Sequence, residues 1–255
     1  MNPGFDGPVR LVQVSDCHVS SVPGTLYRGF DPFSGLKRLL PEIRAFGADA
    51  LVLTGDISED GSAVSYCRVH ELLLGLDIPL LALPGNHDDP EEMRRHFSSG
   101  PWGGPYFERI GNWLIALLDS TIPGGISGAL DEAKMEALAA GLADSDARYI
   151  LFALHHQPMA VKSRWIDRYA LQGGDAFQRF VQAEGRSRAV AWGHVHQAFE
   201  RKTGDVLWLG APSSAANSEP GREKFTPDAA GPACRWLVLQ PDGRIETGLL
   251  RTRPA

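Results

Sequence analysis

The chain has 255 residues, 43% of them hydrophobic and 22% charged, a composition typical of a globular protein with one large core. Its formal net charge of −6 argues against general binding to nucleic acids, because proteins that bind the phosphate backbone are usually basic. The charge still permits a small anionic substrate, since a bound metal ion can supply positive charge locally.

The three cysteines, Cys17, Cys67 and Cys234, are odd in number and widely spaced. This spacing predicts neither a disulfide framework nor a CxxC zinc site, and it fits a reducing compartment. The first ten residues lack the basic and apolar segments of a signal peptide, and no apolar run approaches the roughly 18 residues that span a bilayer. We therefore expect a cytoplasmic protein without membrane insertion.

The first part of the chain alternates between buried strands and helices. In chain order, the pattern predicts strand, helix, strand, helix and strand over residues 9–15, 36–47, 48–56, 62–76 and 79–86. Pro41 lies inside the first helical pattern and predicts a kink or the start of a new helix there. A short helix follows over residues 89–97, with Asp89 as its N-cap and Pro90 at its first position.

The second part of the chain continues this alternation. It predicts strand, helix, strand, helix and strand over residues 112–120, 130–143, 148–156, 175–185 and 188–196, and then strands at 205–214 and within 234–250. The segment Pro241-Asp242-Gly243 joins the last two strands. Such alternation predicts an α/β fold in which helices cover the sheets on both faces. Because no internal repeat or linker divides the chain, residues 1–255 are expected to form a single domain.

Five of the predicted strands end in clusters of residue types that bind metal ions. These clusters are SDCH at 15–18, TGD at 54–56, GNHDD at 85–89, LHHQP at 154–158 and GHVH at 193–196. Six of the eight histidines lie in them, which leaves only His70 and His96 in predicted helices. Ligands of α/β sheets bind beyond the carboxyl ends of the strands, so the five clusters can meet at one site. Their carboxylates, imidazoles and amide oxygens suit Mn, Fe or Zn, whereas a structural zinc site would need more thiolates.

Each cluster also has a purely structural interpretation. Asp16 alone fits a helix cap, and the Gly-Asp pair that ends in Asp56 fits a turn. His194 and His196 make the best individual case for metal binding, because residues two apart on an extended chain point to one face. Gly193 is expected to let the strand turn sharply enough to present both histidines. Five such clusters at five strand ends favour a metal site over five unrelated caps and turns.

The order of these motifs, Asp-x-His, Gly-Asp, Gly-Asn-His-Asp, His and Gly-His-x-His, resembles the calcineurin-like metallophosphoesterase superfamily. The match covers nearly the whole chain. Within the superfamily, the chain is most similar to the bacterial class III 3′,5′-cyclic-nucleotide phosphodiesterases of the CpdA or Icc type. The closer similarity is carried by LDSTIPGGISGALDEAKMEAL, HHQPMAVKSRWIDRYALQGGDAF, GHVHQAFE and APSSAANSEPGREKFTPDAAGPACRWLVL.

The resemblance implies a four-layer α/β/β/α sandwich that holds two metal ions. By this resemblance, one ion would be bound by Asp16, His18 and His196. The other would be bound by Asn86, His155 and His194, and the carboxylate of Asp56 would bridge the two ions. His87 matches the family's active-site histidine that is not a ligand, and His18, Asn86 and His87 would contact the substrate. His155 is assigned as the ligand because it comes first after the strand, with His156 as the alternative.

The resemblance also implies the chemistry of the site. Two ions about 3.5–4 Å apart would clamp a phosphoryl group and activate a water, whose hydroxide attacks phosphorus in line. Fe and Mn fit the ligand types and the family best, and Zn or Co can substitute. A protonated His87 would assist the leaving oxygen, an effect worth about 10²–10⁴-fold in rate. Asp88 and Asp119 are interpreted either as groups that orient the histidines or as ordinary caps and turns.

The expected substrate is 3′,5′-cyclic AMP or another cyclic nucleotide, hydrolysed to the nucleoside monophosphate. Alternatives keep the metal centre but change the substrate to a glycerophosphodiester, a nucleotide pyrophosphate linkage or a phosphomonoester. A non-catalytic metal-binding scaffold is disfavoured, because every matched ligand position is filled. Residues 165–172 and the Gly/Pro-rich loop 217–233 are candidates for selecting the substrate. We expect no stable complex with nucleic acid, and the resemblance implies a homodimer or a larger homo-oligomer.

The bridging role of Asp56 predicts how replacing its carboxylate with a neutral amide of the same shape affects metal binding and turnover. Asp56→Asn should lower both metal content and turnover, because an amide lacks the charge that holds two cations together. Metal analysis and hydrolysis of bis(p-nitrophenyl) phosphate measure the two effects. Two ions per chain together with full activity would show that Asp56 does not bridge them.

Overall fold

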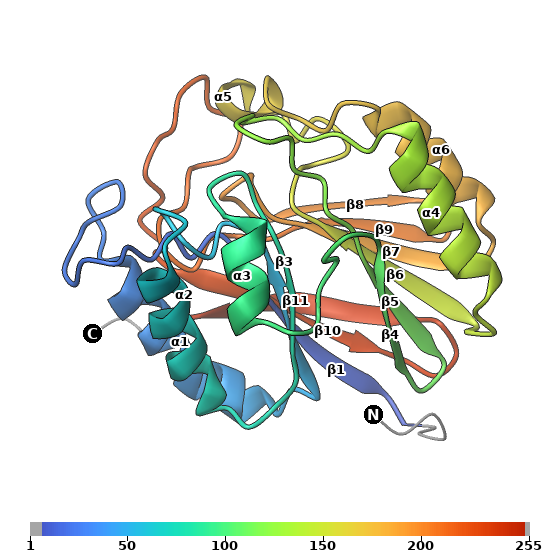
Figure 1. The fold of residues 1–255 in the computed structure, drawn as a ribbon, viewed down its shortest axis with the longest axis horizontal. Helices are drawn as coiled ribbons and strands as arrows, with labels where there is room; N and C mark the ends of the chain where they lie inside the picture. Colours follow the sequence, from blue (N-terminus) through green and yellow to red (C-terminus); the bar gives the residue numbers. More distant parts are fainter. Residues whose placement is uncertain (1–6, 253–255) are drawn as a thin grey trace.

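Two β-sheets lie face to face in the computed structural model, which describes residues 7–252. Helices cover the outer face of each sheet, so the layers run helix, sheet, sheet, helix (Figure 1). The expected α/β/β/α sandwich is therefore confirmed. The expectation that helices cover both faces of a sheet is wrong for either sheet alone, because the inner face of each packs against the other sheet.

The first sheet has five strands in the order β11-β10-β1-β2-β3. Their bounds are β1 Val9–Val14, β2 Ala50–Thr54, β3 Leu80–Leu83, β10 Ala233–Leu239 and β11 Ile245–Arg251. Strands β1, β2 and β3 run parallel, so they all end at the same edge of the sheet. The antiparallel hairpin of β10 and β11 adds the C-terminal segment beside β1, as the turn at Pro241-Asp242-Gly243 predicts.

The second sheet has six strands in the order β4-β5-β6-β7-β9-β8. Their bounds are β4 Tyr106–Ile110, β5 Trp113–Leu117, β6 Tyr149–Leu154, β7 Ser187–Trp192, β8 Phe199–Thr203 and β9 Val206–Gly210. The four inner strands are parallel, and β4 and β8 are antiparallel edges. The sequence pattern does not predict these two edge strands, because they are partly exposed and contain charged residues, so neither forms an apolar run.

Residues 7–252 form six helices. Helices α1 Pro32–Phe46, α2 Ala63–Leu74 and α3 Pro90–His96 lie on the first sheet, and α4 Glu132–Ala143 and α6 Gly174–Ala183 on the second, with the short α5 Arg164–Asp167 at one end (Figure 1). Helix α1 begins earlier than predicted, at a cap formed by Asp31, and it continues through Pro41 instead of restarting there. Asp89 caps α3 as predicted, since its side chain accepts hydrogen bonds from two amides of the first turn. Among residues 7–252, no helix combines the length and apolar character needed to cross a membrane.

Three apolar cores fill the spaces between the four layers. Adjacent residues of one strand contribute to different cores, because successive side chains of a strand point to opposite faces. On β6, Leu151 packs in the core between the sheets, and Phe152 packs against Phe177 of α6. On β2, Val52 faces the second sheet, while Leu53 faces the outer helices. The strands are therefore buried on both faces and can fix the polar segments that follow their carboxyl ends.

Candidate functional site

The five polar clusters meet where the carboxyl ends of the two sheets come together. Three of the clusters follow β1, β2 and β3 in the first sheet, and two follow β6 and β7 in the second. Their ligand atoms form four overlapping groups of three, and within each group all atoms lie within 4.8 Å of one another. The groups are His155, His156 and His194; Asp16, His18 and His196; His18, Asp56 and His87; and Asp16, Asp56 and His155. The structure thus brings together residues that are up to 180 positions apart in the sequence.

Asp56 lies at the centre of these groups and is almost completely buried. Its Oδ2 atom is 3.7 Å from His18 Nε2 and 3.4 Å from His155 Nε2. Its Oδ1 atom accepts a hydrogen bond of 2.9 Å from the backbone amide of His87. One carboxylate therefore faces histidines from both sheets, which is the position that a bridging ligand requires.

A second carboxylate, Asp16, organises the histidines that follow β7. Its two oxygens accept hydrogen bonds of 3.1 and 3.0 Å from the backbone amide of His194. Its Oδ1 atom also lies 3.3 Å from His196 Nε2, which is in turn 3.1 Å from His18 Nε2. Asp16, His18 and His196 therefore direct one oxygen and two nitrogens into the same small space.

Three of the histidines are oriented through the ring nitrogen that faces away from this space. His155 Nδ1 donates to the Thr54 carbonyl at 2.8 Å, and His196 Nδ1 donates to the Ala216 carbonyl at 2.7 Å. His18 Nδ1 lies 2.7 Å from a carboxylate oxygen of Glu59. In each case Nε2 is left facing the site, the arrangement typical of histidines that bind metal ions.

Several buried polar atoms at the site have no hydrogen-bond partner among the described residues. They are Asn86 Oδ1, His155 Nε2 and His194 Nε2. Burying such atoms unpaired costs free energy, and native proteins usually avoid it unless another group binds them. All three are atoms that coordinate divalent cations, so the residues present fit a metal ion.

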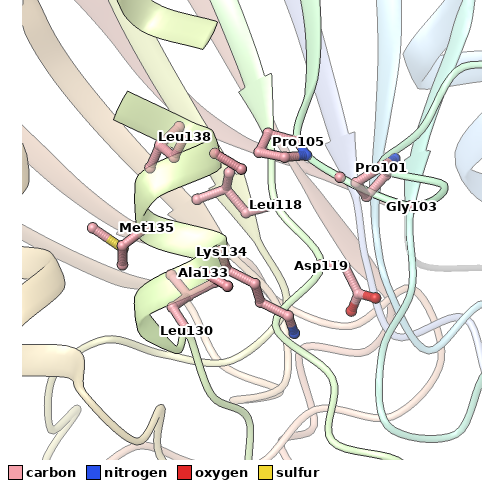
Figure 2. A pocket seen from close by; sticks show the side chains of 12 residues that line it. Pro101, Gly103, Pro105, Leu118, Asp119, Leu130, Ala133, Lys134, Met135 and Leu138 are labelled. Atoms are coloured by element: carbon pink, nitrogen blue, oxygen red, sulfur yellow. The ribbon is translucent and has the colours of Figure 1, made fainter. Parts of the chain in front are cut away.

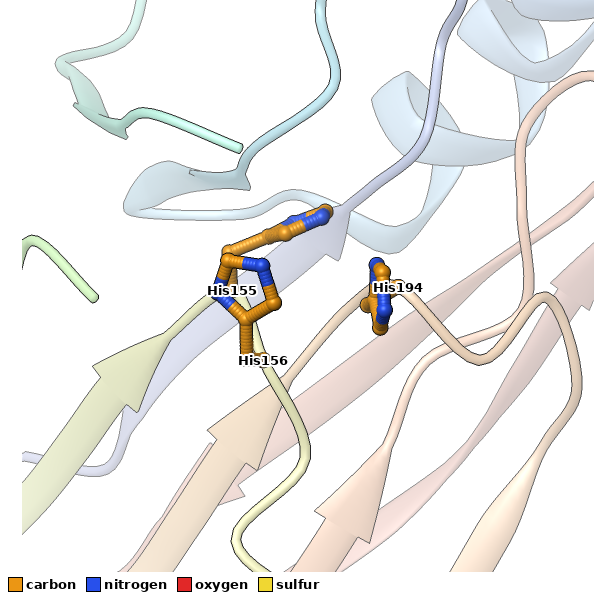
Figure 3. A group of neighbouring side chains, drawn as sticks. All are labelled: His155, His156 and His194. Atoms are coloured by element: carbon orange, nitrogen blue, oxygen red, sulfur yellow. The ribbon is translucent and has the colours of Figure 1, made fainter. Parts of the chain in front are cut away.

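His156 differs from its neighbour His155 in the bonds that its ring makes. Its Nδ1 lies 2.9 Å from the Ser120 hydroxyl, and its Nε2 lies 3.1 Å from the Ile126 carbonyl. A neutral ring that donates from Nε2 and accepts at Nδ1 satisfies both bonds. Figure 3 shows the rings of His155, His156 and His194 close together, yet only His156 has both nitrogens occupied.

The backbone at the site adopts a conformation that side chains other than glycine rarely allow. Eight non-glycine residues in the described chain have a positive φ, and five of them are predicted ligands: Asp16, His18, Asp56, His194 and His196. Each such residue costs on the order of 1–3 kcal/mol, and the strain persists only where surrounding structure enforces it. The strain therefore coincides with the residues predicted to bind metal.

Glycines allow the polar segments to approach one another closely. A Cβ atom on Gly193 would lie 2.7 Å from the Thr54 carbonyl oxygen and 2.8 Å from Asp16 Oδ2. A Cβ on Gly55 would lie 2.7 Å from the backbone nitrogen of Gly85. The chain does turn sharply from Gly193, because the Val195 amide donates to the Gly193 carbonyl at 2.7 Å. The left-handed φ belongs to the histidines that follow and not to Gly193, so the conformational freedom of glycine is not what permits the turn. Gly193 is needed for space instead.

Burial and neighbouring charge shift the pKa values of these groups in opposite directions. Burial alone would raise the pKa of Asp56, but His155 and His18 outweigh it and hold that pKa well below its usual value. Burial alone would lower the pKa of His155, but Asp56 raises it to about 9. Burial together with the adjacent His156 holds the pKa of His194 well below its usual value. His194 is thus kept as the neutral imidazole that a metal ion requires.

A further carboxylate, Glu59, contacts two of the histidines, and the sequence analysis missed it. Its Oε2 atom lies 2.7 Å from His18 Nδ1 and 3.3 Å from His87 Nδ1. The only signal for Glu59 in the sequence is its position three residues after Asp56. Because Glu59 touches one predicted ligand and the predicted non-ligand histidine, it can orient both rings at once.

Asp88 and Asp119 do not contact the histidines, so the interpretation that they orient them is wrong. Asp88 accepts hydrogen bonds from the amides of Gly85 at 2.9 Å and Ser58 at 3.0 Å and thereby ties two of the site segments together. Burial and the nearby charge of Asp56 raise the pKa of Asp88 to about 6. Asp119 accepts from the amide and the hydroxyl of Thr121 in a local turn.

Six of the predicted site residues line a cleft of about 470 Å³: His18, Asp56, Asn86, His87, His194 and His196. A separate hollow of about 320 Å³ lies between α4 and the segment 101–105 (Figure 2). Asp119 borders this hollow, but apolar side chains such as Leu118 and Leu138 form most of it. None of the predicted ligands lines it, so the chemistry of the chain is concentrated in the larger cleft.

Known proteins are similar to this chain in sequence and in fold. Residues 9–198 match the calcineurin-like phosphoesterase family. The chain is 35% identical to the 3′,5′-cyclic adenosine monophosphate phosphodiesterase CpdA of Pseudomonas aeruginosa, over 98% of this chain and 92% of that one. It is 30% identical to a 3′,5′-cyclic-nucleotide phosphodiesterase of Nostoc sp., over 96% and 92% of the two chains. A dimetal phosphatase of Danio rerio has a similar fold, with a TM-score of 0.71 at 14% identity over 97% of this chain and 100% of that one.

The close approach at Gly193 predicts that even a methyl group disturbs the site. Gly193→Ala should lower the free energy of unfolding by about 1–3 kcal/mol, because its Cβ would overlap atoms of Thr54 and Asp16. Metal content should fall with it, since the same overlap displaces Asp16. Denaturant unfolding and metal analysis measure these effects. Gly185→Ala is the matched control, because a Cβ there meets nothing within 4 Å, and equal behaviour of the two variants would contradict the close-approach role.

Proposed function

Because the chain belongs to the calcineurin-like phosphoesterase family, we propose that it hydrolyses 3′,5′-cyclic AMP to 5′-AMP at a centre of two metal ions. As a member of this family related to cyclic-nucleotide phosphodiesterases over nearly its full length, the chain is a metal-dependent phosphodiesterase. The observation that carries the proposal is that three buried ligand atoms at the site of Asp56 make no hydrogen bond to a described residue: Asn86 Oδ1, His155 Nε2 and His194 Nε2.

We assign the metal ligands in two sets around Asp56. The first set is Asp16, His18 and His196, the second is Asn86, His155 and His194, and Asp56 belongs to both. His155 is preferred to His156 because its Nε2 atom makes no hydrogen bond and faces the Asp56 carboxylate at 3.4 Å, whereas both nitrogens of His156 have hydrogen-bond partners. Fe and Mn are the proposed metals, with Zn or Co as substitutes, since imidazole and oxygen ligands do not select strictly among them.

When bound, two such ions neutralise charge on the phosphoryl oxygens and supply a nucleophilic hydroxide at neutral pH. The residues of the chain hold the substrate and manage the remaining proton. The NH₂ group of Asn86 can donate to a phosphoryl oxygen while its Oδ1 serves as a ligand. His87 lines the cleft, and its Nδ1 faces Glu59, which leaves Nε2 to protonate the departing ribose oxygen. His18, as a ligand beside the cleft, completes the proposed substrate contacts.

We also propose that residues 1–255 act as one domain. Two observations support this: apolar cores join each layer to the next, and the similarity to relatives extends over nearly the full length of the chain. A cytoplasmic location is proposed because Cys17, Cys67 and Cys234 are all free thiols, as expected in a reducing compartment. The proposed ligand of the site is a small-molecule phosphodiester.

A substrate panel tests the proposed function directly. After reconstitution with Mn, kcat/KM should be highest for cyclic AMP among cyclic nucleotides, a glycerophosphodiester, a nucleotide pyrophosphate and p-nitrophenyl phosphate. Prior removal of metal with a chelator should abolish turnover, because the unpaired ligand atoms then hold nothing. A preference for the monoester or for the glycerophosphodiester would replace cyclic AMP with that substrate class. Two bound ions without turnover of any compound would indicate a scaffold.

His87→Ala separates chemistry from metal binding. The variant should keep its metal content but lose about 10²–10⁴-fold in kcat with cyclic AMP, because no group remains to protonate the leaving oxygen. The loss should be smaller with bis(p-nitrophenyl) phosphate, whose nitrophenolate leaves without a proton. Near-normal turnover of cyclic AMP would remove His87 from the mechanism.

A further inference from the structure

The cleft has a second half that the metal ligands do not form. Beyond the histidines, it is lined by the aromatic side chains Tyr27, Trp165 and Tyr169, by the segment 124–126 and by Arg28. Arg28 is the only lysine or arginine among the described residues that line the cleft. A phosphodiester whose phosphorus lies at the metal ligands must place its larger substituent over this second half.

Aromatic rings extend from the predicted metal ligands into this second half. The ring of Tyr27 stacks on His18, with centroids 3.9 Å apart and an interplanar angle of 6°. The ring of Trp165 meets His196 edge to face at 6.3 Å and Phe225 edge to face at 5.3 Å. Three segments that are distant in the sequence thus place Tyr27, Trp165 and Phe225 around His196, and we call these three rings the aromatic wall. Tyr27 and Trp165 line the cleft, and Phe225 supports Trp165 from behind the lining.

Arg28 is fixed against this aromatic wall. Its guanidinium carbon lies 4.1 Å from the centroid of Phe225, 5.3 Å from that of Tyr27 and 5.9 Å from that of Trp165. Its Nε donates to the Tyr27 hydroxyl at 3.1 Å, and no other hydrogen bond from Arg28 to a described residue occurs. The two terminal NH₂ groups are therefore oriented by the rings but remain available to a ligand.

Two further features mark these residues as a binding surface. Arg28 has a φ of 48°, so it is the sixth of the eight strained non-glycine residues in the described chain that belong to this site. The indole N–H of Trp165 is buried and has no hydrogen-bond partner among residues 7–252. An oriented cation beside aromatic rings suits a ligand that offers both an aromatic face and hydrogen-bond acceptors.

Hydrogen bonds hold the loops that carry this wall in place. Ser163, just before α5, accepts from the backbone amide of Gly221 at 2.9 Å and donates to Gln197 at 2.7 Å. Arg164 pairs with Glu223 at 3.0 Å, which joins α5 to the loop that carries Phe225. The wall therefore needs little reordering when a ligand binds, and this lowers the entropic cost of binding.

We propose that Arg28 and Trp165 bind the nucleoside part of the substrate and determine the preference for nucleoside phosphodiesters over simple ones. The base stacks against the part of the aromatic wall that lines the cleft, Tyr27 and Trp165, and the Arg28 NH₂ groups donate to acceptors of the base or ribose. This subsite rests on the proposed function, because it places the nucleoside beside a phosphoryl group held at the metal ligands. Neither residue touches the reacting atoms, so both act on binding and not on the chemical step.

The test compares a substrate that has a nucleoside with one that lacks it. Arg28→Ala and Trp165→Leu should each raise KM for cyclic AMP about tenfold, the magnitude expected for one lost base-stacking or charged contact. They should leave kcat for cyclic AMP and kcat/KM for methyl p-nitrophenyl phosphate within about twofold of the unmodified protein, since the metal ligands are intact. Inhibition of the simple ester's hydrolysis by 5′-AMP should weaken about tenfold, while inhibition by inorganic phosphate stays unchanged.

Arg179→Ala is the matched control, because Arg179 is an exposed arginine on α6 that neither lines the cleft nor contacts the aromatic wall. If Arg28→Ala and Trp165→Leu lowered kcat/KM equally for cyclic AMP and for the simple ester, or for neither, the subsite would be overturned. The proposal that the protein hydrolyses cyclic AMP would still stand. If the unmodified protein cleaves the simple ester but no cyclic nucleotide, the proposed function fails. The subsite is then decided by 5′-AMP inhibition alone, and inhibition that does not depend on Arg28 would overturn it as well.

Discussion

The buried carboxylate of Asp56 connects the two halves of the site. It follows β2 in one sheet, and it faces His18 from the same sheet and His155 from the other. The core between the sheets, with residues such as Val52 and Leu151, sets how far apart these elements lie. A carboxylate that is shielded from water is tolerated only with compensating positive charge and hydrogen bonds, which here come from imidazoles, an amide and the proposed metal ions.

The arrangement of the site conflicts with the local preferences of the chain. Five predicted ligands have left-handed backbone conformations, and three buried ligand atoms lack partners in the protein. The strands that precede them are buried on both faces, so the sandwich provides the stability that these segments lack. Glycine at positions 55, 85 and 193 keeps the backbones close enough for the ligand sets to form. Function is thus concentrated at the point where local and global preferences disagree, as expected for an active site.

The cleft combines two kinds of chemistry because two kinds of segment meet there. Short turns at the strand ends supply the histidines and carboxylates, which the parallel strands position rigidly. Longer connections supply the aromatic wall, and they are fixed to one another by Ser163 and by the Arg164–Glu223 pair. The rigid part suits a phosphoryl group that all phosphodiesters share, and the loop part suits the substituent that distinguishes one substrate from another.

The sequence by itself determined the residue types at the strand ends, their order and the α/β character of the chain. These features are local, because strand and helix periods and ligand chemistry can be recognised within a few residues. It missed the edge strands β4 and β8, and it expected conformational freedom to be the reason for Gly193. It left open for Asp88 and Asp119 an orienting role, which the structure excludes, beside the role of ordinary caps and turns. Only the tertiary structure decided that Glu59 orients two histidines, that both nitrogens of His156 are occupied and that Arg28 lies against Trp165 and Phe225. Those contacts join residues up to about 200 positions apart, and their distances depend on the order and packing of two sheets, which no short stretch of sequence specifies.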